Sequence, residues 1–473
     1  MTETATIAVP AFEQAEVQDQ LRTARKVRTS YEPAGEFIKR IKDMAERSRD
    51  FLVPFDKLKV VVDEVSNPTL TEEGFVDNPS YKLRLAFQNG DEKLLSGMYE
   101  HVLGHLCGHT SIGDKAGMPV QYLKRLLSDG RDKPLIHLAA ANVNELLGRR
   151  HGEVHTRGKA GQEKAVFVRT FRTDEGLKCR AILSDRYFPI RTLDMVTIAL
   201  AAATGKNLNN DSDLTAVKGA FMFDQHLSVT GCSVGFVNPS RAFDLRNPDR
   251  GIIEAERVSY NDDGRPTFHY PGGSSYQLGG QFNYPSDGPR QHLVLPAARI
   301  KNSETGGGSA EVQPMLFETV CTNGMVFAKA LKRTHVSQIM SDTDDYESDK
   351  TKKKAMEWVI SKMTDAMQQV FDVEQFRTNC LKFLNLAKVE VKSVKEVTEH
   401  LLSAIPGGDG LLEDVLKAYE QFTPGKDTVL DVQRALTSVA QDQSYDKQET
   451  MEELAGSIVA GERSIKKELL VNA

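Results

Sequence analysis

The chain has 473 residues, of which 40% are hydrophobic and 27% charged, a balance that is ordinary for globular proteins. Its five cysteines, an odd number with no two close together, argue against a disulfide framework and a zinc ribbon. No window is long and apolar enough to span a membrane, and the acidic start MTETATIAVP is unlike a signal peptide, so we expect a cytoplasmic protein without a membrane partner.

Charge is distributed unevenly along the chain. The formal net charge is −6, and residues 405–473 alone hold 7 Lys and Arg against 13 Asp and Glu, which is also −6. The acidic character therefore belongs to the C-terminal tail, and the rest of the chain is close to neutral. That remainder is free to carry local basic patches.

The first 150 residues divide into an arm and a mixed segment. Residues 1–35 are small and polar without sustained periodicity, so we expect a disordered or extended N-terminal arm. Residues 36–150 are expected to form an N-terminal α/β segment that is mostly helical. The elements predicted within it are a helix at 36–50, strands at 58–65 and 81–87, and helices across 92–148.

A β-rich core is expected over residues 151–345. Two strands, 165–171 and 178–187, are joined by a turn at 173–176, and a buried helix follows at 192–205. Further strands are predicted near 219–225, 226–236, 292–300, 311–321 and 325–333. The stretch 237–290 is rich in Gly, Pro and Tyr, and we interpret it as one long loop.

Helical patterns dominate from residue 346 onward. We expect a long-helix region at 346–404 and an acidic helical tail at 405–473, with the hinge IPGGDG at 405–410 between them. The hinge and the change of charge predict that the tail is separable from the body. The fold class is therefore α+β, with a central, mostly antiparallel sheet, a preceding helical segment and a helical C-terminal region.

Three runs of sequence resemble a known family. They are GHLCGHTSIGDKAGMPVQYLKRLL at 104–127, CRAILSDRYFPIRTLDMV at 179–196, and NSETGGGSAEVQPMLFETVCTNGMVF at 302–327. From about residue 80 to residue 461 the chain is similar to the phage/plasmid-like protein family, which is defined by a domain of unknown function. The resemblance implies a bacteriophage or plasmid origin and a location in the host cytoplasm. It transfers no catalytic residue.

Two histidine-containing stretches are weak candidates for a metal site. His101, His105 and His109 are spaced four apart and would share one helix face, but the glycines between them weaken such a helix. The run HGEVH at 151–155 has Gly152 where a zinc-protease helix requires Glu directly after the first His. We therefore expect no bound metal and no cofactor.

Nucleophilic constellations are also weak. Cys321 would need a histidine folded onto it, and a small buried residue at a strand end is the simpler interpretation. The triple glycine at 306–308 is followed by neither Lys-Ser/Thr nor a helix, so it predicts a tight turn with positive φ rather than a phosphate loop.

The stretch with the clearest functional indication mixes cations and aromatic rings. In VFVRTFRTDEGLKCRAILSDRYFPIR (166–191), strands of period two would place alternate residues on one face. Cations on phosphates and rings under bases are the combination that holds single-stranded nucleic acid. The alternative is an ordinary sheet with aromatic core residues and arginines at its solvated rim. The candidate nucleic-acid-binding residues are Arg169, Arg172, Lys178, Arg180, Arg186, Phe171, Tyr187, Lys332 and Arg333.

Three classes of function are compatible with these patterns. The first is a non-enzymatic protein associated with nucleic acid, handling single-stranded DNA in replication or recombination of a mobile element. The second is an interaction or structural protein that binds a host protein, or forms a homo-oligomer, through the helical tail. The third is an enzyme with an unrecognised site. We favour the first because mobile elements often encode proteins that handle DNA, which is an inference by association.

Overall fold

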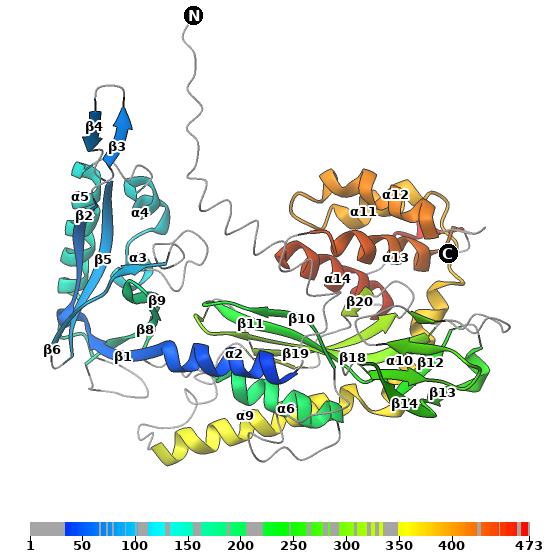
Figure 1. Cartoon of the computed structure of the whole chain (residues 1–473). Coiled ribbons are helices and arrows are strands. Elements are labelled where there is room, and N and C mark those ends of the chain that lie inside the picture. Colours follow the sequence, from blue (N-terminus) through cyan, green and yellow to red (C-terminus); the bar gives the residue numbers. More distant parts are fainter. Residues whose placement is uncertain are drawn as a thin grey trace, which may run out of the picture.

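A computed structural model of the chain (Figure 1) has α+β architecture, with antiparallel sheets and with helices in the N-terminal and C-terminal regions. The described residues are 34–65, 68–71, 74–77, 80–89, 91–99, 102, 112–127, 133–154, 161, 163–185, 187, 190–204, 221–245, 247–262, 266–277, 282–283, 293–306, 310–318, 323–326, 331–333, 349–422, 427–443, 445–460 and 465–471. Residues 1–33 of the expected arm, and the histidines at 101, 105 and 109, lie outside these ranges. Among the described residues, no helix is both long and apolar enough to cross a membrane.

Strands β1 to β9 and helices α3 to α5 form an N-terminal lobe. Its strands are β1 (Ser48–Pro54), β2 (Leu58–Val65), β3 (Pro68–Thr71), β4 (Gly74–Asp77), β5 (Ser80–Asn89), β6 (Asp91–Leu94), β7 (Gly97–Met98), β8 (Ala165–Thr173) and β9 (Gly176–Ser184). Its helices are η1 (Phe55–Lys57), α3 (Ile112–Ala116), α4 (Val120–Leu127) and α5 (Lys133–Arg149). One sheet has the order β1-β8-β9-β7, a second has β2-β5-β6, and β3 pairs with β4.

The expected hairpin at 165–187 is confirmed as β8 and β9, which pair antiparallel. The described part of the expected α/β segment at 36–150 contains seven strands beside helices α2 (Ala34–Arg47) to α5, so strand is more prominent in it than expected. The expected helical pattern from residue 92 does not begin there, because residues 91–94 form β6 and residues 97–98 form β7. The apolar residues of this run are too few to show a period. Pairing of β6 with the adjacent β5, and of β7 with β9 about eighty residues away, decides the conformation.

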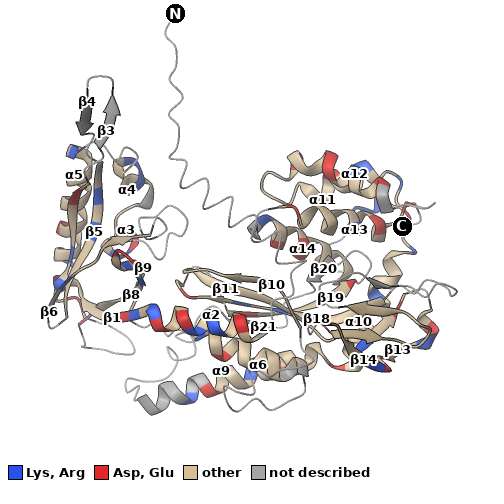
Figure 2. Cartoon of the chain, viewed as in Figure 1, with Lys and Arg blue, Asp and Glu red and all other residues tan. Residues whose placement is uncertain are grey.

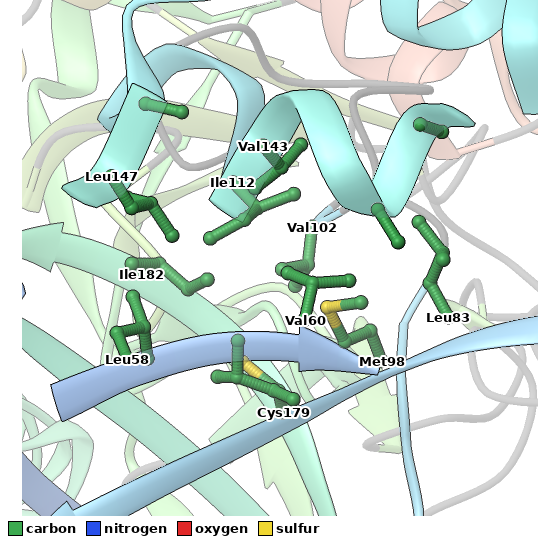
Figure 3. Close-up of a cluster of buried hydrophobic side chains, with 14 of the residues drawn as sticks. Leu58, Val60, Leu83, Met98, Val102, Ile112, Val143, Leu147, Cys179 and Ile182 are labelled. Carbon is green, nitrogen blue, oxygen red and sulfur yellow. The ribbon is translucent and has the colours of Figure 1, made fainter. Parts of the chain in front are cut away.

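The core of the N-terminal lobe lies between the sheets and the three helices (Figure 3). Apolar residues alternate along β2 and β5, and these contribute Leu58, Val60 and Leu83 to the interior. Helix α5 contributes Val143 and Leu147, which are four residues apart and so share one face. This burial fixes the orientation of the sheet β1-β8-β9-β7, here called the first sheet. The opposite face of the first sheet is turned toward the rest of the molecule.

An eight-stranded sheet, here called the main sheet, forms the centre of the molecule. Its strands are β10 (Phe221–Leu227), β11 (Gly231–Val237), β12 (Arg241–Asp244), β13 (Ile252–Glu254), β18 (Leu293–Ser303), β19 (Ala310–Glu318), β20 (Asn323–Val326) and β21 (Leu331–Arg333). The order is β10-β11-β18-β12-β13, and β19 pairs with β18, β20 and β21. All of these pairings are antiparallel, as expected.

Helices α2 (Ala34–Arg47), α6 (Thr192–Thr204) and α9 (Asp349–Val370) pack on one face of the main sheet (Figure 1). Helix α6, TLDMVTIALAAAT, is apolar nearly all round, which is typical of a buried helix. Helix α2 is amphipathic and turns Phe37, Ile38 and Ile41 inward. It runs directly into β1, so the N-terminal lobe is connected to this helical layer by a continuous segment.

The expectation of one long loop at 237–290 is wrong. The described part of this stretch contains β12 and β13 of the main sheet and a separate four-stranded antiparallel sheet. The strands of that sheet are β14 (Arg257–Tyr260), β15 (Pro266–His269), β16 (Ser275–Gln277) and β17 (Phe282–Asn283). The strands have only two to four residues, too few to show alternation between the Gly and Pro residues. Phe268 of β15, Tyr276 of β16 and Tyr270, which directly follows β15, are core residues.

The C-terminal region is helical, as expected. It comprises α10 (Val373–Leu386), α11 (Val394–Leu402), η5 (Gly408–Leu411), α12 (Leu412–Phe422), α13 (Val429–Ala440), α14 (Tyr445–Ala460) and η6 (Lys467–Leu469). Side chains at the N-caps of three helices accept backbone N–H groups, which defines where these helices begin: Asp372 for α10, Ser393 for α11 and Thr428 for α13.

A separable tail beyond residue 405 does not agree with the structure. Residues of α13 and α14 share a buried cluster with Val294 and Leu316 of the main sheet. Arg299 of β18 and Glu452 of α14 are both fully buried, and their Nη1 and Oε2 atoms are 2.7 Å apart. Glu449 of α14 likewise contacts Lys301 of β18, so two acidic residues of the expected tail meet basic residues of the sheet, whereas most of the others that the structure describes are exposed.

Candidate functional site

Arg169 stands in the middle of β8 and is only 4% exposed. Its Nε lies 3.1 Å from Oδ1 of Asp50, the residue opposite it on β1, and its Nη1 lies 3.0 Å from Oε2 of Glu304. Burial opposes the charged form, but the carboxylates of Glu304 and Asp50 outweigh it and raise the pKa of Arg169. The guanidinium thus remains charged and joins the N-terminal lobe to the end of β18.

Arg180 reaches the same carboxylate because β9 is bulged. Cys179 and Ala181 pair with consecutive residues of β8, so Arg180 is the extra residue of the bulge. A bulge redirects side chains away from the regular alternation of a strand. The Arg180 Nη2 lies 3.7 Å from Oε2 of Glu304, and the Arg180 side chain is 2% exposed.

Glu304 joins these two arginines to helix α6. At the first residue of α6, the Thr192 hydroxyl donates to Oε1 of Glu304. Asn302 Nδ2 donates to Thr192 Oγ1 at 3.0 Å and to the Ile190 carbonyl at 2.8 Å. Glu304 is thus held on one side by the lobe and on the other by the start of a buried helix.

Tyr187 completes the buried side of the cluster. Its hydroxyl donates to the Ser303 carbonyl at 3.2 Å, and its ring centroid lies 6.2 Å from that of Phe167. Burial raises the pKa of Tyr187 to about 12, so the phenol is neutral near pH 7. Gly306, two residues after Glu304, has φ +73, which confirms the expected turn with positive φ at that residue. Gly307 and Gly308 lie outside the described residues.

The cluster joins Asp50 and Arg169 to residues from two of the three sequence runs quoted above. Residues 180–192 come from the second run and residues 302–306 from the third. Two arginines and two carboxylates, those of Glu304 and Asp50, balance their charges there. Removing one partner from such a buried set leaves an uncompensated charge, which makes these residues interdependent. We call Asp50, Arg169, Arg180, Tyr187 and Glu304 the lock, because their contacts join the N-terminal lobe to the main sheet.

The structure corrects three of the predicted nucleic-acid-binding residues. Arg169 and Arg180 are buried in this lock, and Phe171 is 9% exposed, so none of them presents its side chain to a ligand. Alternation placed Arg169 on the same face as Phe171, but that face is covered by the Glu304 turn and α2 rather than by solvent. Phe171 is a core residue, as the alternative of an ordinary sheet predicts. Arg169 and Arg180 differ from that alternative, because they are buried and do not lie at a solvated rim.

The other predicted residues are placed differently. Arg172 is exposed, and Lys178 is half-buried with its Nζ 4.5 Å from the centroid of Tyr99. Tyr187 is partly buried and hydrogen-bonded as described. Arg186 lies outside the described residues, as do the side chains of Lys332 and Arg333 on β21.

A second surface combines cations with a ring at the edge of the first sheet. We define the edge patch as Arg49, Phe51, Lys93 and Arg172. Arg49 pairs with Thr170, so Arg172, two residues further on β8, is its diagonal neighbour on the same face at about 7–8 Å. Phe51 is partly exposed on that face, and Lys93 Nζ lies 5.9 Å from its ring centroid. Both arginines are exposed.

Sequence reasoning missed Arg49, Phe51 and Lys93. The predicted helix at 36–50 included Arg49, whereas the helix ends at Arg47 and β1 begins at once. Pairing between β1 and β8 joins residues more than a hundred positions apart, which no local pattern reveals. Figure 2 shows basic and acidic positions interspersed along the neighbouring α2, so the helix presents no surface of one sign.

Three buried thiols and one group of possible metal ligands are not part of the lock. Cys179, Cys232 and Cys380 are buried, and burial raises the pKa of Cys179 to about 12, so none is an accessible thiolate. Among the described residues, one group could hold a metal ion: Asp56, His151 and Glu163.

Comparisons with protein-family models, with curated proteins and with solved structures find no match to the chain. The functional interpretation therefore depends on the geometry of its own residues.

Proposed function

We propose that the protein is a non-enzymatic, mobile-element protein of the phage/plasmid-like group that binds single-stranded nucleic acid through the edge patch. Arg49 and Arg172 would contact successive phosphates, and Phe51 would lie under a base. One observation carries the proposal: two exposed guanidinium groups are diagonal neighbours on paired strands, with a partly exposed ring beside them.

The patch is positioned by rigid parts of the fold. Beneath Phe51 lies Phe87 of β5, with ring centroids 5.0 Å apart and planes at 54°. Arg49 Nη1 donates to the carbonyls of Ser48 and Glu46, at 3.0 and 3.2 Å, which holds the guanidinium near the start of β1. A cation that is already ordered loses less entropy when it contacts a phosphate.

The test is fluorescence anisotropy with a labelled oligothymidine at low salt. The double variant Arg49→Ala/Arg172→Ala should bind about tenfold or more weakly than the unaltered chain, because it loses two phosphate contacts. The matched control is Arg149→Ala/Arg377→Ala, which removes the same charge from exposed positions on α5 and α10.

Binding by the control should equal that of the unaltered chain. If both double variants lose the same affinity, the attraction depends on net charge and the edge patch is not the site. If the unaltered chain does not bind in the micromolar range at low salt, the proposal fails, and the interaction-protein alternative takes its place.

A further inference from the structure

Three metal-ligating side chains from separate segments meet at one end of α5. Asp56 is in η1, His151 follows the last turn of α5, and Glu163 forms a bridge with Val154. One ligand atom from each lies within 4.8 Å of the other two. The run HGEVH cannot form a zinc-protease site by itself, because Gly152 follows His151. The fold instead supplies the carboxylates from outside that run.

The separations fit a small divalent cation. His151 Nδ1 is 3.7 Å from Oδ2 of Asp56 and 3.5 Å from Oε1 of Glu163. Ligand atoms about 2.0–2.2 Å from a tetrahedral zinc ion lie roughly 3.4 Å apart. The two carboxylate oxygens lie within 4.8 Å of each other, so side-chain shifts of about 1 Å or less would bring all three atoms around one ion.

The backbone that carries the ligands is held together by the neighbouring residues. Arg150, beside His151, lies over the ring of Phe55, beside Asp56, at 4.3 Å from the centroid. Arg150 Nη2 also contacts Oε2 of Glu153 at 3.2 Å. Lys164, beside Glu163, reaches the same Glu153 oxygen at 3.2 Å. A chain of contacts Phe55–Arg150–Glu153–Lys164 thus fixes the spacing of all three ligand-bearing segments.

One ligand is oriented by an additional hydrogen bond. The Gly152 N–H donates to Oε1 of Glu163 at 3.2 Å, and Gly152 has φ +75, which a residue with a side chain rarely adopts. Hydrogen bonds to a ligating carboxylate from a second layer of residues are typical of metal sites. The glycine that excluded a zinc-protease helix therefore serves to position a carboxylate here.

The donor set and the exposure indicate the kind of ion. One imidazole and two carboxylates suit zinc among the common divalent cations better than calcium or magnesium, which take mostly oxygen ligands. The His151 side chain is 63% exposed and that of Glu163 45%, so water can complete the coordination. Lys57 Nζ lies 3.5 Å from Oδ2 of Asp56 and is half-exposed, so it can swing away when an ion binds.

We propose that Asp56, His151 and Glu163 form a divalent-cation site, with zinc as the preferred ion, that cross-links η1, the end of α5 and the segment entering β8. The site is independent of the proposed nucleic-acid contacts, because it lies in different residues and needs no nucleic acid to be measured.

Zinc binding is measured by isothermal titration with ZnCl₂ on the full chain, and thermal unfolding is followed with and without zinc. The unaltered chain should bind one more zinc ion than His151→Ala, and zinc should raise its Tm but not that of the variant. Asp56→Asn and Glu163→Gln should each weaken binding about tenfold or more, since outer-layer changes alone cost that much. The matched control is His137→Ala, an exposed histidine on the same helix.

The comparison between variants keeps the test decisive, because histidines elsewhere in the chain could bind zinc as well. Equal zinc stoichiometry in the unaltered chain and in His151→Ala overturns the proposal, as does equal loss in His137→Ala. A Tm of the unaltered chain that zinc does not raise would likewise contradict the site. If His151→Ala fails to fold, Glu163→Gln, which alters an exposed side chain, decides the outcome.

Discussion

Glu304 supplies the negative charge that Arg169 and Arg180 share. Changing it to Ala should destabilise the protein by about 3–5 kcal/mol, because it removes a carboxylate from two buried guanidinium groups. Urea unfolding followed by circular dichroism measures the change. The matched control is Glu145→Ala, which removes the exposed partner of Arg149 and should cost less than about 1 kcal/mol. Equal losses of unfolding free energy in the two variants would show that the lock stabilises the protein no more than an exposed ion pair does.

At the residue scale, the sequence points to the two arginines and the tyrosine of the lock, but not to their role or to the carboxylates that they contact. Arg169, Arg180 and Tyr187 were singled out because cations and rings alternate along 166–191. Their partner Glu304 is more than a hundred residues away, and burial depends on that contact. In the edge patch, Arg172 could be recognised from the sequence pattern. Its neighbour Arg49 could not, because no local pattern encodes the pairing of β1 with β8.

At the scale of the element, the turn after β18 holds Glu304 in place. Gly306 has φ +73, and a Cβ added there would lie 2.7 Å from Cδ2 of Leu183 on β9. Gly306→Ala therefore combines an unfavourable backbone conformation with a steric clash, and should destabilise the protein by about 1–3 kcal/mol.

Gly410→Ala provides the comparison for this glycine, because its φ is not positive and nothing lies within 4 Å of an added Cβ. Thermal unfolding of the two variants should show a lower Tm only for Gly306→Ala. An unchanged Tm would mean that the turn can move without disturbing the lock.

Elements with sustained patterns were predictable and short ones were not. The hairpin β8–β9, helix α6 and the C-terminal helices each have enough residues to show a period or a cap. The strands within 237–290 have two to four residues and owe their conformation to pairing and to buried aromatic rings. The bulge at Arg180 was likewise invisible, since a single extra residue does not disturb an apolar pattern.

At the scale of the whole molecule, the C-terminal helices complete the core of the main sheet. A truncation ending at Ser403 removes Glu452, which contacts the fully buried Arg299, and exposes the apolar residues that α13 and α14 cover. This truncation should fail to give a cooperative thermal transition. If protease cuts the chain between 405 and 410, the two fragments should still elute together in gel filtration.

A smaller change tests the same contact. Glu452→Gln keeps the size of the side chain but loses its charge, so it should destabilise the protein by about 3 kcal/mol or more in urea. A truncation that unfolds cooperatively with unaltered stability would show that the tail is separable after all, as its charge and hinge suggested.

The salt dependence of oligonucleotide binding is the most direct measure of whether Arg49 and Arg172 contact phosphates. The logarithm of the binding constant falls with the logarithm of salt concentration by about 0.7 per phosphate contact on a single strand. The slope for Arg49→Ala/Arg172→Ala should therefore be shallower than that of the unaltered chain by about 1.4. The slope for Arg149→Ala/Arg377→Ala should be unchanged. Identical slopes for all three proteins, or no binding by the unaltered chain, would contradict a nucleic-acid site at the edge patch.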